Sequence, residues 1–569
     1  MINSTSTFSA AKHGTVSSKE GALLLLAVLV SLALRLPLLG RLSFTGIELQ
    51  LSSLALLISR GVTTGGSAVP AYTGLTSLLF YLFEPSNWLA RLVPALAGAS
   101  LIALPFLWRK ETGSRFGLIL GLVLVIDPVF ILFSRSINPG VIALAGLLWS
   151  VSFLRIRKPT LAGISLAIGF LSGAAFWNYL ILLAITFLIA MLYFGKVELK
   201  DFIESIRIKT LLSPGTIIAF IATTVLLSTS FLLDPTGLGG LGSSLVGFVR
   251  QFSQSFEKPA YHPIYLIFAH SILPLLLCLL GFFSSKITQQ RKIYIFLLLA
   301  SAATILIGGF MSRSSFELLL ISVGLLWCGG AILLSNIHIE KQDVNFASIF
   351  LAIFTGTILI FVSQNLRKLA SLSTDSPAFL TSSLILAAGI FLLLCTWWLV
   401  KFAWQGGEMN RVMLMSLVVF LFVASFAGIF HPILDEDDTT TLEYLDASIY
   451  LPNDDVEKVL AEISLTGKTL PHLGSYQIQG LPAELEWYLR DFDAQNTQDD
   501  PILILSRDSA LPESTAEFRG MNIVLTRYID WKSTNALEYL RIMLGKETIT
   551  IDEKAVLWIR TNMFTGANQ

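Results

Sequence analysis

Residues 21–40 read "GALLLLAVLVSLALRLPLLG", and they decide the class of the chain. Arg35 is the only charged side chain in this run. About 20 consecutive apolar residues suffice to cross a bilayer as a helix, and such a run is too long for the core of a signal peptide. No small-residue cleavage site follows it. We therefore predict a retained transmembrane helix, preceded by a polar N-terminal tail, residues 1–20.

Runs of the same kind recur along the first three quarters of the 569-residue chain. Hydrophobic residues make up 54% of the sequence and charged residues 14%, which indicates a membrane protein rather than a water-soluble one. The predicted fold class is an α-helical polytopic membrane protein with about thirteen transmembrane helices. The predicted spans lie near 21–40, 88–108, 116–134, 140–155, 160–176, 178–195, 211–233, 263–283, 293–310, 316–335, 346–364, 380–400 and 412–430.

Basic clusters in short loops give the predicted orientation, because Lys and Arg favour the cytoplasmic side of a membrane. The clusters fall in alternate loops, at residues 109–115, 155–158, 196–209 and 286–292. This phasing predicts a multi-pass protein of the plasma membrane with a cytoplasmic N-terminus. A transmembrane domain, residues 21–432, is then followed by an extracytoplasmic domain, residues 433–569.

The C-terminal domain differs from the membrane part in charge and in pattern. From residue 435 onward the chain holds 24 acidic and 11 basic residues, out of 39 of each in the whole sequence. Short β-rich runs alternate there with amphipathic helices, which predicts a soluble α/β domain. We expect this acidic domain to offer a docking surface to another protein. The equal totals of acidic and basic residues argue against a nucleic-acid partner.

Two long outer loops, residues 41–87 and 234–262, are the places where function is expected. The first contains "PAYTGLTSLLFYLF", residues 70–83, which is too short to span comfortably and would invert every later loop if it did. We predict helices on the outer surface there. The second contains "DPTGLGGLGSSL", residues 234–245, whose glycines permit a mobile backbone. A gate or lid over an outer-leaflet site is the prediction for this loop.

Ionisable groups at membrane depth are costly and often functional. Those predicted near the outer face are Arg35, Glu48, Arg91, Asp127, Arg135 and Arg313. Guanidinium groups bind phosphate oxygens through paired hydrogen bonds, so the set suits an anionic lipid phosphate. The alternative for each arginine is ordinary contact with lipid headgroups.

Asp127 has three competing interpretations. It precedes Pro128 in "LVLVIDPVFILFSR", residues 122–135. Its carboxylate would face a wet cavity, pair with Arg135 at helical spacing, or satisfy backbone groups freed by the proline. A structural role is favoured over direct catalysis.

Metal and cofactor chemistry has little support in the sequence. His262 and His270 could approach one helical face, but two histidines without a carboxylate are weak evidence for a metal. All three cysteines lie within apolar runs, so neither a disulfide nor a thiolate site is indicated. No phosphate loop or nucleotide fingerprint is present. The prediction is no cofactor and no divalent metal.

Several motifs together resemble a known family. They are "WLARLVPALAGASLIALPFLW" at 88–108, "LVIDPVFILFSRSINPG" at 124–140 and "KPAYHPIYLIFAHSILPLL" at 258–276. The chain resembles the GT-C superfamily of membrane glycosyltransferases, in its protein-O-mannosyltransferase and aminoarabinose-transferase-like branch, including the flippase-activity-associated subfamily. The resemblance implies a cavity that is open to the outer leaflet and binds a polyprenyl-phosphate-linked sugar. The sugar would pass to an extracytoplasmic protein or glycan acceptor.

The resemblance also implies roles for particular residues. Glu48 matches the Glu of the family's Asp-Glu motif and becomes the candidate base, whereas Ile47 occupies the place of the Asp. A second Asp of the family is replaced in the "SRSINPG" stretch, where Asn138 stands. The implied lipid-phosphate and substrate-binding residues are Tyr72, Arg91, Arg135, Asn138, Tyr261, His262 and Arg313.

Three accounts of the function stay open. Glu48 is the base of an active glycosyltransferase, or Asp127 substitutes for it as a weaker candidate. Alternatively, the protein is a catalytically inactive accessory or scaffold protein that binds a lipid-linked sugar or a partner protein. A secondary transporter has less support, because no pair of broken helices recurs at matching positions in two halves.

Overall fold

The structure of the chain is a computed structural model. It describes residues 18–194, 208–252, 262–285, 288–310, 315–336, 346–372, 376–403, 416–424, 449–450, 476–490, 503–507, 517–531, 538, 541–542 and 550–561. Within these ranges the chain is a mostly helical membrane protein with a strand-containing C-terminal region, as predicted.

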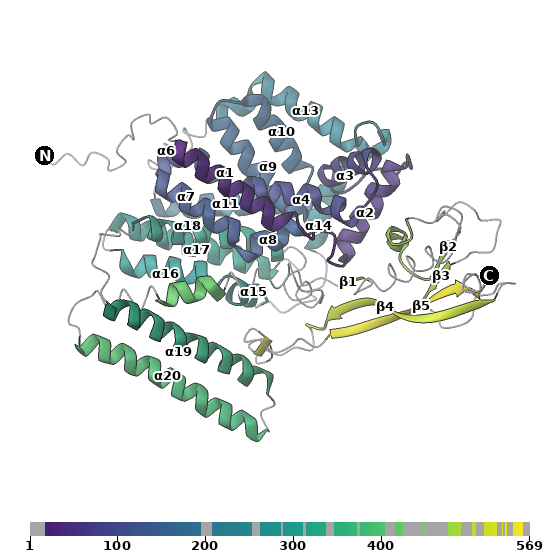
Figure 1. Ribbon diagram of the computed structural model, residues 1–569. Coiled ribbons are helices and arrows are strands. Elements are labelled where there is room, and N and C mark those ends of the chain that lie inside the picture. Colours follow the sequence, from purple (N-terminus) through teal and green to yellow (C-terminus); the bar gives the residue numbers. More distant parts are fainter. Residues whose placement is uncertain are drawn as a thin grey trace.

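Helices fill the first three quarters of the described chain, and most of them form one bundle (Figure 1). Their bounds are α1 Ser18–Arg35, α2 Gly46–Ser59, α3 Pro70–Leu82, α4 Asn87–Leu101, α5 Leu104–Leu107, α6 Arg109–Thr112, α7 Ser114–Ile126, α8 Pro128–Arg135, α9 Pro139–Arg155, α10 Pro159–Phe170, α11 Ala174–Phe194, η1 Ile208–Leu212, α13 Pro214–Ser228, η2 Pro235–Gly242, α14 Ser243–Gln251, α15 His262–His270, α16 Ile272–Ser284, α17 Thr288–Phe310, α18 Ser315–Asn336, α19 Phe346–Ser371 and α20 Pro377–Ala403.

The helices reproduce the predicted apolar runs closely. Among the described residues, six helices are long and apolar enough to cross a membrane, or seven when the bent pair α7 and α8 counts as one. Other apolar helices, including α9, α10, α13 and α16, have 10 to 17 residues. The total of about thirteen spans therefore stays a prediction, and only residues 416–424 of the run at 412–430 are described.

Proline fixes where many of these helices begin. Its missing N–H costs nothing in the first turn, and its fixed φ suits the helix. Prolines at the start of a helix are Pro70, Pro128, Pro139, Pro159 and Pro214. At Pro128 the consequence is a break, because α7 and α8 meet there at 58°. Asp127 lies at this break and caps α8 by accepting a hydrogen bond from the Phe130 N–H at 3.0 Å.

The C-terminal strands form a five-stranded sheet in the order β1-β4-β5-β3-β2. Their bounds are β1 Ile449–Tyr450, β2 Tyr476–Gln479, β3 Leu503–Ser506, β4 Phe518–Ile529 and β5 Thr550–Arg560, with a short helix η5, Ala483–Trp487, between β2 and β3. All neighbouring strands are antiparallel except β2 and β3. Four strands, β1, β3, β4 and β5, lie in β-rich runs of the sequence, "ASIYLPN", "DPILILSRD", "MNIVLTRYIDW" and "KAVLWIR", whereas no strand is predicted at β2. The amphipathic helices that "DVEKVLAEI", 455–463, and "STNALEYLRIML", 533–544, predict lie largely outside the described residues.

The sheet region shares a core with the membrane part. One continuous buried cluster contains Phe44, Phe80 and Ile137 from the membrane part and Trp487 and Leu557 from the C-terminal region. Figure 1 shows η5 and the sheet beside the ends of α2 and α3. The described part of the C-terminal region is therefore docked on the first outer loop, across the domain boundary placed at residue 433.

Helices α19 and α20 form a hairpin that stands apart from the main bundle (Figure 1). Within an apolar stretch of 18 residues, only 17% of α19 and 11% of α20 is buried inside the protein. Large exposed side chains, among them Phe350, Phe391 and Trp398, cover both helices. A bilayer is the environment in which such all-round apolar helices are stable.

Candidate functional site

Within the first outer loop, Thr45 and Glu48 together cap the start of α2. The Thr45 side chain accepts a hydrogen bond from the Glu48 N–H at 3.4 Å, and Glu48 Oε2 accepts one from the Thr45 N–H at 2.9 Å. This reciprocal capping box satisfies backbone donors that a helix start leaves open. The side chain of Glu48 is therefore turned back toward the loop, and only 2% of it is exposed.

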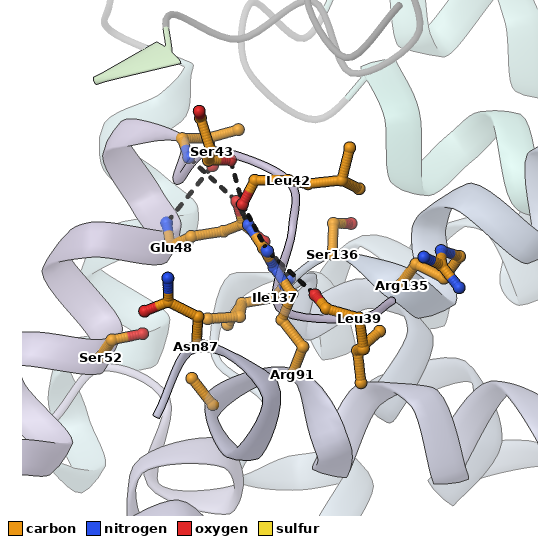
Figure 2. Close-up of polar contacts among 12 residues, drawn as sticks. Leu39, Leu42, Ser43, Glu48, Ser52, Asn87, Arg91, Arg135, Ser136 and Ile137 are labelled. Carbon is orange, nitrogen blue, oxygen red and sulfur yellow. Dashed lines mark hydrogen bonds and ion pairs between the residues drawn. The ribbon is translucent and has the colours of Figure 1, made fainter. Parts of the chain in front are cut away.

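Arg91 of α4 holds both oxygens of the Glu48 carboxylate. Arg91 Nε donates to Oε1 at 3.0 Å, and Nη2 donates to Oε2 at 3.1 Å. The Ile137 N–H, between α8 and α9, adds a third segment by donating to Oε1 at 2.8 Å. Figure 2 shows this convergence of α2, α4 and the segment at Ile137. With Thr45, the carboxylate accepts four hydrogen bonds, which fills its usual acceptor capacity.

The N–H donors of Arg91 are also all hydrogen-bonded. Its remaining N–H groups bond the carbonyl oxygens of Leu39 at 3.1 Å, Leu42 at 2.7 Å and Ser43 at 3.0 Å. Together with the two bonds to Glu48, these use all five donors that a guanidinium carries. The Phe44 ring lies 4.5 Å from the guanidinium carbon and closes one face. Arg91 thus fixes the path of residues 39–48, and none of its donors points to a ligand.

Arg135 and Arg35 fasten the end of α1. Arg135 Nη1 donates to the carbonyl oxygens of residues 34, 35 and 37 at 3.1, 3.1 and 2.8 Å, and Nη2 donates to that of Leu38 at 3.2 Å. Cations are favourable beside such helix C-terminal carbonyls. Arg35 Nε donates to Ser134 Oγ at 2.9 Å. Figure 2 shows the Arg135 guanidinium well apart from that of Arg91.

Asp127 is held inside the helix bundle. Besides capping α8, its carboxylate accepts a hydrogen bond from Trp327 Nε1 of α18 at 2.6 Å, and the residue is 1% exposed. Of the three interpretations of Asp127, the pairing with Arg135 is not formed, because Arg135 donates to the carbonyl oxygens at the end of α1. The interpretation in which Asp127 satisfies backbone groups at the proline is the one the geometry bears out.

The other sequence-derived candidates make contacts of their own. Tyr72 is fully buried and donates its hydroxyl to the Ala90 carbonyl oxygen at 3.0 Å. Asn138 caps α9 by accepting from the Gly140 N–H at 2.7 Å. His262 packs against Trp531 of the C-terminal region, with ring centroids 5.0 Å apart. Tyr261 and Arg313 lie outside the described residues.

Ile47 is directed away from this network. Its neighbour Glu48 is buried, yet Ile47 is 61% exposed. The contacts that hold Glu48 therefore leave residue 47, which the family resemblance matches to an aspartate, on the outside of the protein. An apolar side chain at this position can neither accept a proton nor bind a sugar hydroxyl.

The two outer loops are joined by Asp234, which the sequence analysis did not single out. Its Oδ2 accepts from the Thr64 N–H at 3.2 Å and the Thr64 hydroxyl at 2.9 Å. Its Oδ1 accepts from the Thr236 N–H at 3.1 Å and the Thr236 hydroxyl at 2.5 Å. Burial raises the pKa of Asp234, but the hydrogen bonds from Thr236 and Thr64 outweigh burial and hold the pKa below its usual value.

The glycines of the second loop serve close packing. A Cβ at Gly237 would overlap the Ser228 carbonyl oxygen, and one at Gly240 would lie 2.8 Å from the Ser67 carbonyl oxygen. Gly66 of the first loop has a φ of +103° and lies against Gly240. The predicted mobile backbone is thus, at η2, a tightly packed contact between the two loops.

Trp487 is a second residue that the sequence analysis did not assign to the site. Its ring lies 5.5 Å from Phe44 and 5.5 Å from Phe80, and its Nε1 donates to Asn87 Oδ1 at 3.0 Å. β1 adds a backbone contact, because the Tyr450 N–H donates to the Phe44 carbonyl oxygen at 2.9 Å. The C-terminal region thereby covers the loop that Arg91 and Glu48 shape from below.

Metal-binding geometry is absent from the described part of the chain, where no three His, Cys, Asp or Glu side chains come together. The expectation that the protein needs no metal or cofactor stays a prediction.

No protein-family model and no curated protein sequence matches the chain. Solved structures do. The chain is similar to ArnT from Cupriavidus metallidurans bound to undecaprenyl phosphate, with 13% identity, a TM-score of 0.50, and coverage of 84% of this chain and 85% of that chain. Apo ArnT from the same organism matches with 14% identity, a TM-score of 0.49, and coverage of 83% and 85%.

The fold is ArnT-like. The likeness to ArnT extends over most of both chains, so it includes the membrane bundle and not a shared helix pair alone. At this level of identity the comparison concerns the fold. The roles of Glu48, Arg91 and the other site residues stay predictions, and their contacts must be weighed on their own.

Proposed function

We propose that this GT-C-like membrane protein binds a polyprenyl-phosphate-linked sugar at its outer face as an accessory protein, without transferring the sugar itself. The fold supports the lipid part of the proposal, since the similar ArnT chain was crystallised with undecaprenyl phosphate. The extracytoplasmic orientation follows from the basic loop clusters.

The contacts of Glu48 support the proposal that the protein does not transfer the sugar. A general base needs a free lone pair within reach of the proton it removes. Glu48 instead accepts four hydrogen bonds, two of them from Arg91, and is 2% exposed. Asp127 is no better placed, because Trp327 and the Phe130 N–H occupy it inside the bundle. Neither sequence-derived carboxylate is available as a base.

Of Arg35, Arg91 and Arg135, only Arg135 keeps a guanidinium nitrogen donor that a lipid phosphate could take. A phosphate would reach it only if the end of α1 that buries it moved. Arg135 is 1% exposed, and its Nε has no hydrogen-bond partner within the described part of the chain. A buried donor left unpaired is costly, and an anionic oxygen would remove that cost. Arg91 has no comparable donor to offer.

An active transferase is the second candidate, and one observation favours it. The contacts that hold Glu48 still leave residue 47 on the outside, at 61% exposure, as an enzyme with an aspartate there would need. In this account, a group of the substrate or of the undescribed segments supplies the base.

The two candidates are separated with the purified full-length protein in nanodiscs. Native mass spectrometry would measure binding of a polyprenyl-phosphate hexose, and release of polyprenyl phosphate would measure turnover. We expect binding without turnover. Turnover above the rate without protein would establish the transferase, and absence of binding would remove both candidates.

The variants Ile47→Asp and Ile47→Asn test whether the missing acid at position 47 is what makes the protein inactive. Ile47→Asp restores the family's acid at an exposed position without touching the contacts of Glu48 and Arg91. Turnover gained by Ile47→Asp but not by Ile47→Asn would show that only the base is lacking. If Ile47→Asp binds lipid and stays inert, more than one catalytic group has been lost.

A further inference from the structure

Helix α14, Ser243–Gln251, buries polar side chains and exposes apolar ones, which is the opposite of a surface helix in a water-soluble protein. Its buried residues are the polar Ser244 and Gln251, which are 5% and 7% exposed. Most of its apolar side chains face outward instead, and Phe248 is partly buried. Their exposed fractions are 47% for Leu245, 48% for Val246, 59% for Val249 and, at the cap, 54% for Phe252. Positions 245, 249 and 252 fall on one helical face by their spacing.

The inward polar face of α14 is anchored to a transmembrane helix. Gln251 Nε2 donates to Asn178 Oδ1 at 2.8 Å, and Asn178 is 1% exposed. A buried side-chain pair of this kind fixes orientation, because breaking it leaves unsatisfied polar groups. α14 therefore cannot roll its apolar face inward without a cost.

The anchor sets the depth of α14 in the membrane. Asn178 belongs to α11, Ala174–Phe194, a helix long and apolar enough to span. Asn178 is the fifth residue of α11, so it lies about 6 Å from the start of the helix at 1.5 Å per residue. The far end of α11 leads toward the basic segment 196–209, which is predicted to be cytoplasmic. α14 consequently lies at the outer end of a span.

A lipid environment continues from α11. The same helix exposes Leu180 and Leu183, at 37% and 45%, just below the anchor point. Through η2, α14 is also tied to the first outer loop, since Gly240 packs against Ser67. The neighbouring α3 ends in the exposed residues Tyr81, Leu82 and Phe83.

From these contacts we propose that α14 lies in the outer-leaflet interface, with Leu245, Val249 and Phe252 on the acyl chains of the bilayer. A helix with an apolar face gains free energy by burying that face at the boundary between headgroups and acyl chains. The second outer loop is then a leaflet-bound anchor, where the sequence indicated a mobile lid. The proposal is independent of whether the protein binds a lipid-linked sugar.

The test places an environment-sensitive fluorophore on Val249→Cys in full-length protein whose Cys278, Cys328 and Cys395 are replaced by alanine. The protein is reconstituted in phosphatidylcholine vesicles that carry a spin label near the headgroup or deep in the acyl chain. Leu183→Cys on α11 is the membrane control. Lys554→Cys, exposed on β5 of the C-terminal region, is the aqueous control.

We expect the shallow spin label to quench the fluorophore at Val249 several-fold more strongly than at Lys554, and the deep label to favour Leu183. Quenching at Val249 equal to that at Lys554 would overturn the proposal, because α14 would then face water. Protection of Val249 from both spin labels and from aqueous iodide would also overturn it, because protein would then cover the helix. Neither measurement needs a donor lipid or turnover, so the result does not depend on the proposed function.

Discussion

Arg91 determines the path of the first outer loop more than any other described residue. It bonds three backbone carbonyls and both oxygens of Glu48, and it does so almost completely buried. A buried ion pair is weak evidence for stability when compared with an apolar pair, but loss of one partner leaves a buried charge. The contribution of Glu48 to the free energy of unfolding should therefore depend on the presence of Arg91, and the reverse.

Glu48→Gln and Arg91→Met should each lower the free energy of unfolding by about 3–5 kcal/mol, whereas the double variant should lose clearly less than the sum. The physical reason is that the double variant leaves no unpaired buried charge. Thermal unfolding in detergent, followed by tryptophan fluorescence, measures the effect. If the wild type turned over substrate and an equally stable Glu48→Gln protein did not, Glu48 would be restored as a catalytic base.

Asp234 should make the junction between the outer loops sensitive to acid. Its folded pKa is lowered, so its stabilising contribution is present above the unfolded value of about 3.9 and is lost as the pH falls through the folded pKa. Asn in its place accepts fewer hydrogen bonds at any pH. Unfolding of Asp234→Asn and wild type, compared from neutral pH downward, should show a difference that narrows below about pH 4. A difference independent of pH would show that the carboxylate charge is irrelevant.

At the residue scale, the sequence located the site better than it explained it. The family resemblance implied that Arg91 and Arg135 lie beside Glu48. Arg91 contacts Glu48, whereas Arg135 donates to the carbonyl oxygens at the end of α1. It was not predictable that the contacts of the Glu48 and Arg91 pair use every acceptor of Glu48 and every donor of Arg91. The contacts join residues that are 43 and 89 positions apart, and one donor is the backbone N–H of Ile137. An interaction made through a backbone group leaves no residue-type signal in the sequence.

At the scale of elements, the packing of η2 against the end of α13 depends on glycine. Gly237 lies against the Ser228 carbonyl oxygen at the end of α13, whereas a Cβ at Gly242 would meet nothing within 4 Å. The two positions therefore form a matched pair in one short segment.

Gly237→Ala should destabilise the protein by about 1–3 kcal/mol, because the added methyl group overpacks a contact with backbone. Gly242→Ala should change stability by no more than about 0.5 kcal/mol. Thermal unfolding of the two variants under identical conditions measures both. Equal effects would mean that the loop adjusts freely, as a mobile lid would.

The elements themselves were largely predictable, for reasons visible in single residues. The apolar runs and the prolines at 70, 128, 139, 159 and 214 mark the helices that the structure shows. The break at Asp127 followed from Pro128. The short helix η5 lies in "LPAELEWYLRDF", residues 481–492, whose spacing predicts a longer amphipathic helix. Its packing on α2 and α3 is a long-range effect, which local periodicity does not encode.

At the scale of the whole molecule, Trp487 joins the C-terminal region to the membrane part. It is fully buried between Phe44 and Phe80, and Ser53 Oγ reinforces the contact by donating to the Glu484 carbonyl oxygen at 2.7 Å. The Arg60 guanidinium adds a bond to the Arg490 carbonyl oxygen at 2.7 Å. The acidic region is thus a fixed cover on the first outer loop.

Trp487→Ala should cost about 3–5 kcal/mol and loosen this cover, because a large buried side chain is lost from a shared core. Limited proteolysis of the reconstituted protein should then cleave near the first outer loop faster than in the wild type. Asp552→Asn, which removes an ion pair with Arg527 near the surface, is the control and should cost less than about 1 kcal/mol. Unchanged proteolysis in Trp487→Ala would show that the two parts associate without this anchor.

The contact of β1 with the first loop constrains the order of events during synthesis. The Phe44 carbonyl oxygen receives its partner, the Tyr450 N–H, only after about four hundred further residues have been made and residue 450 has reached the same side of the membrane. Until then the loop that contains Glu48 lacks the cover that the C-terminal region provides. A chain that ends before residue 450 would therefore keep its membrane helices but leave this loop open to whatever lies on that side of the membrane.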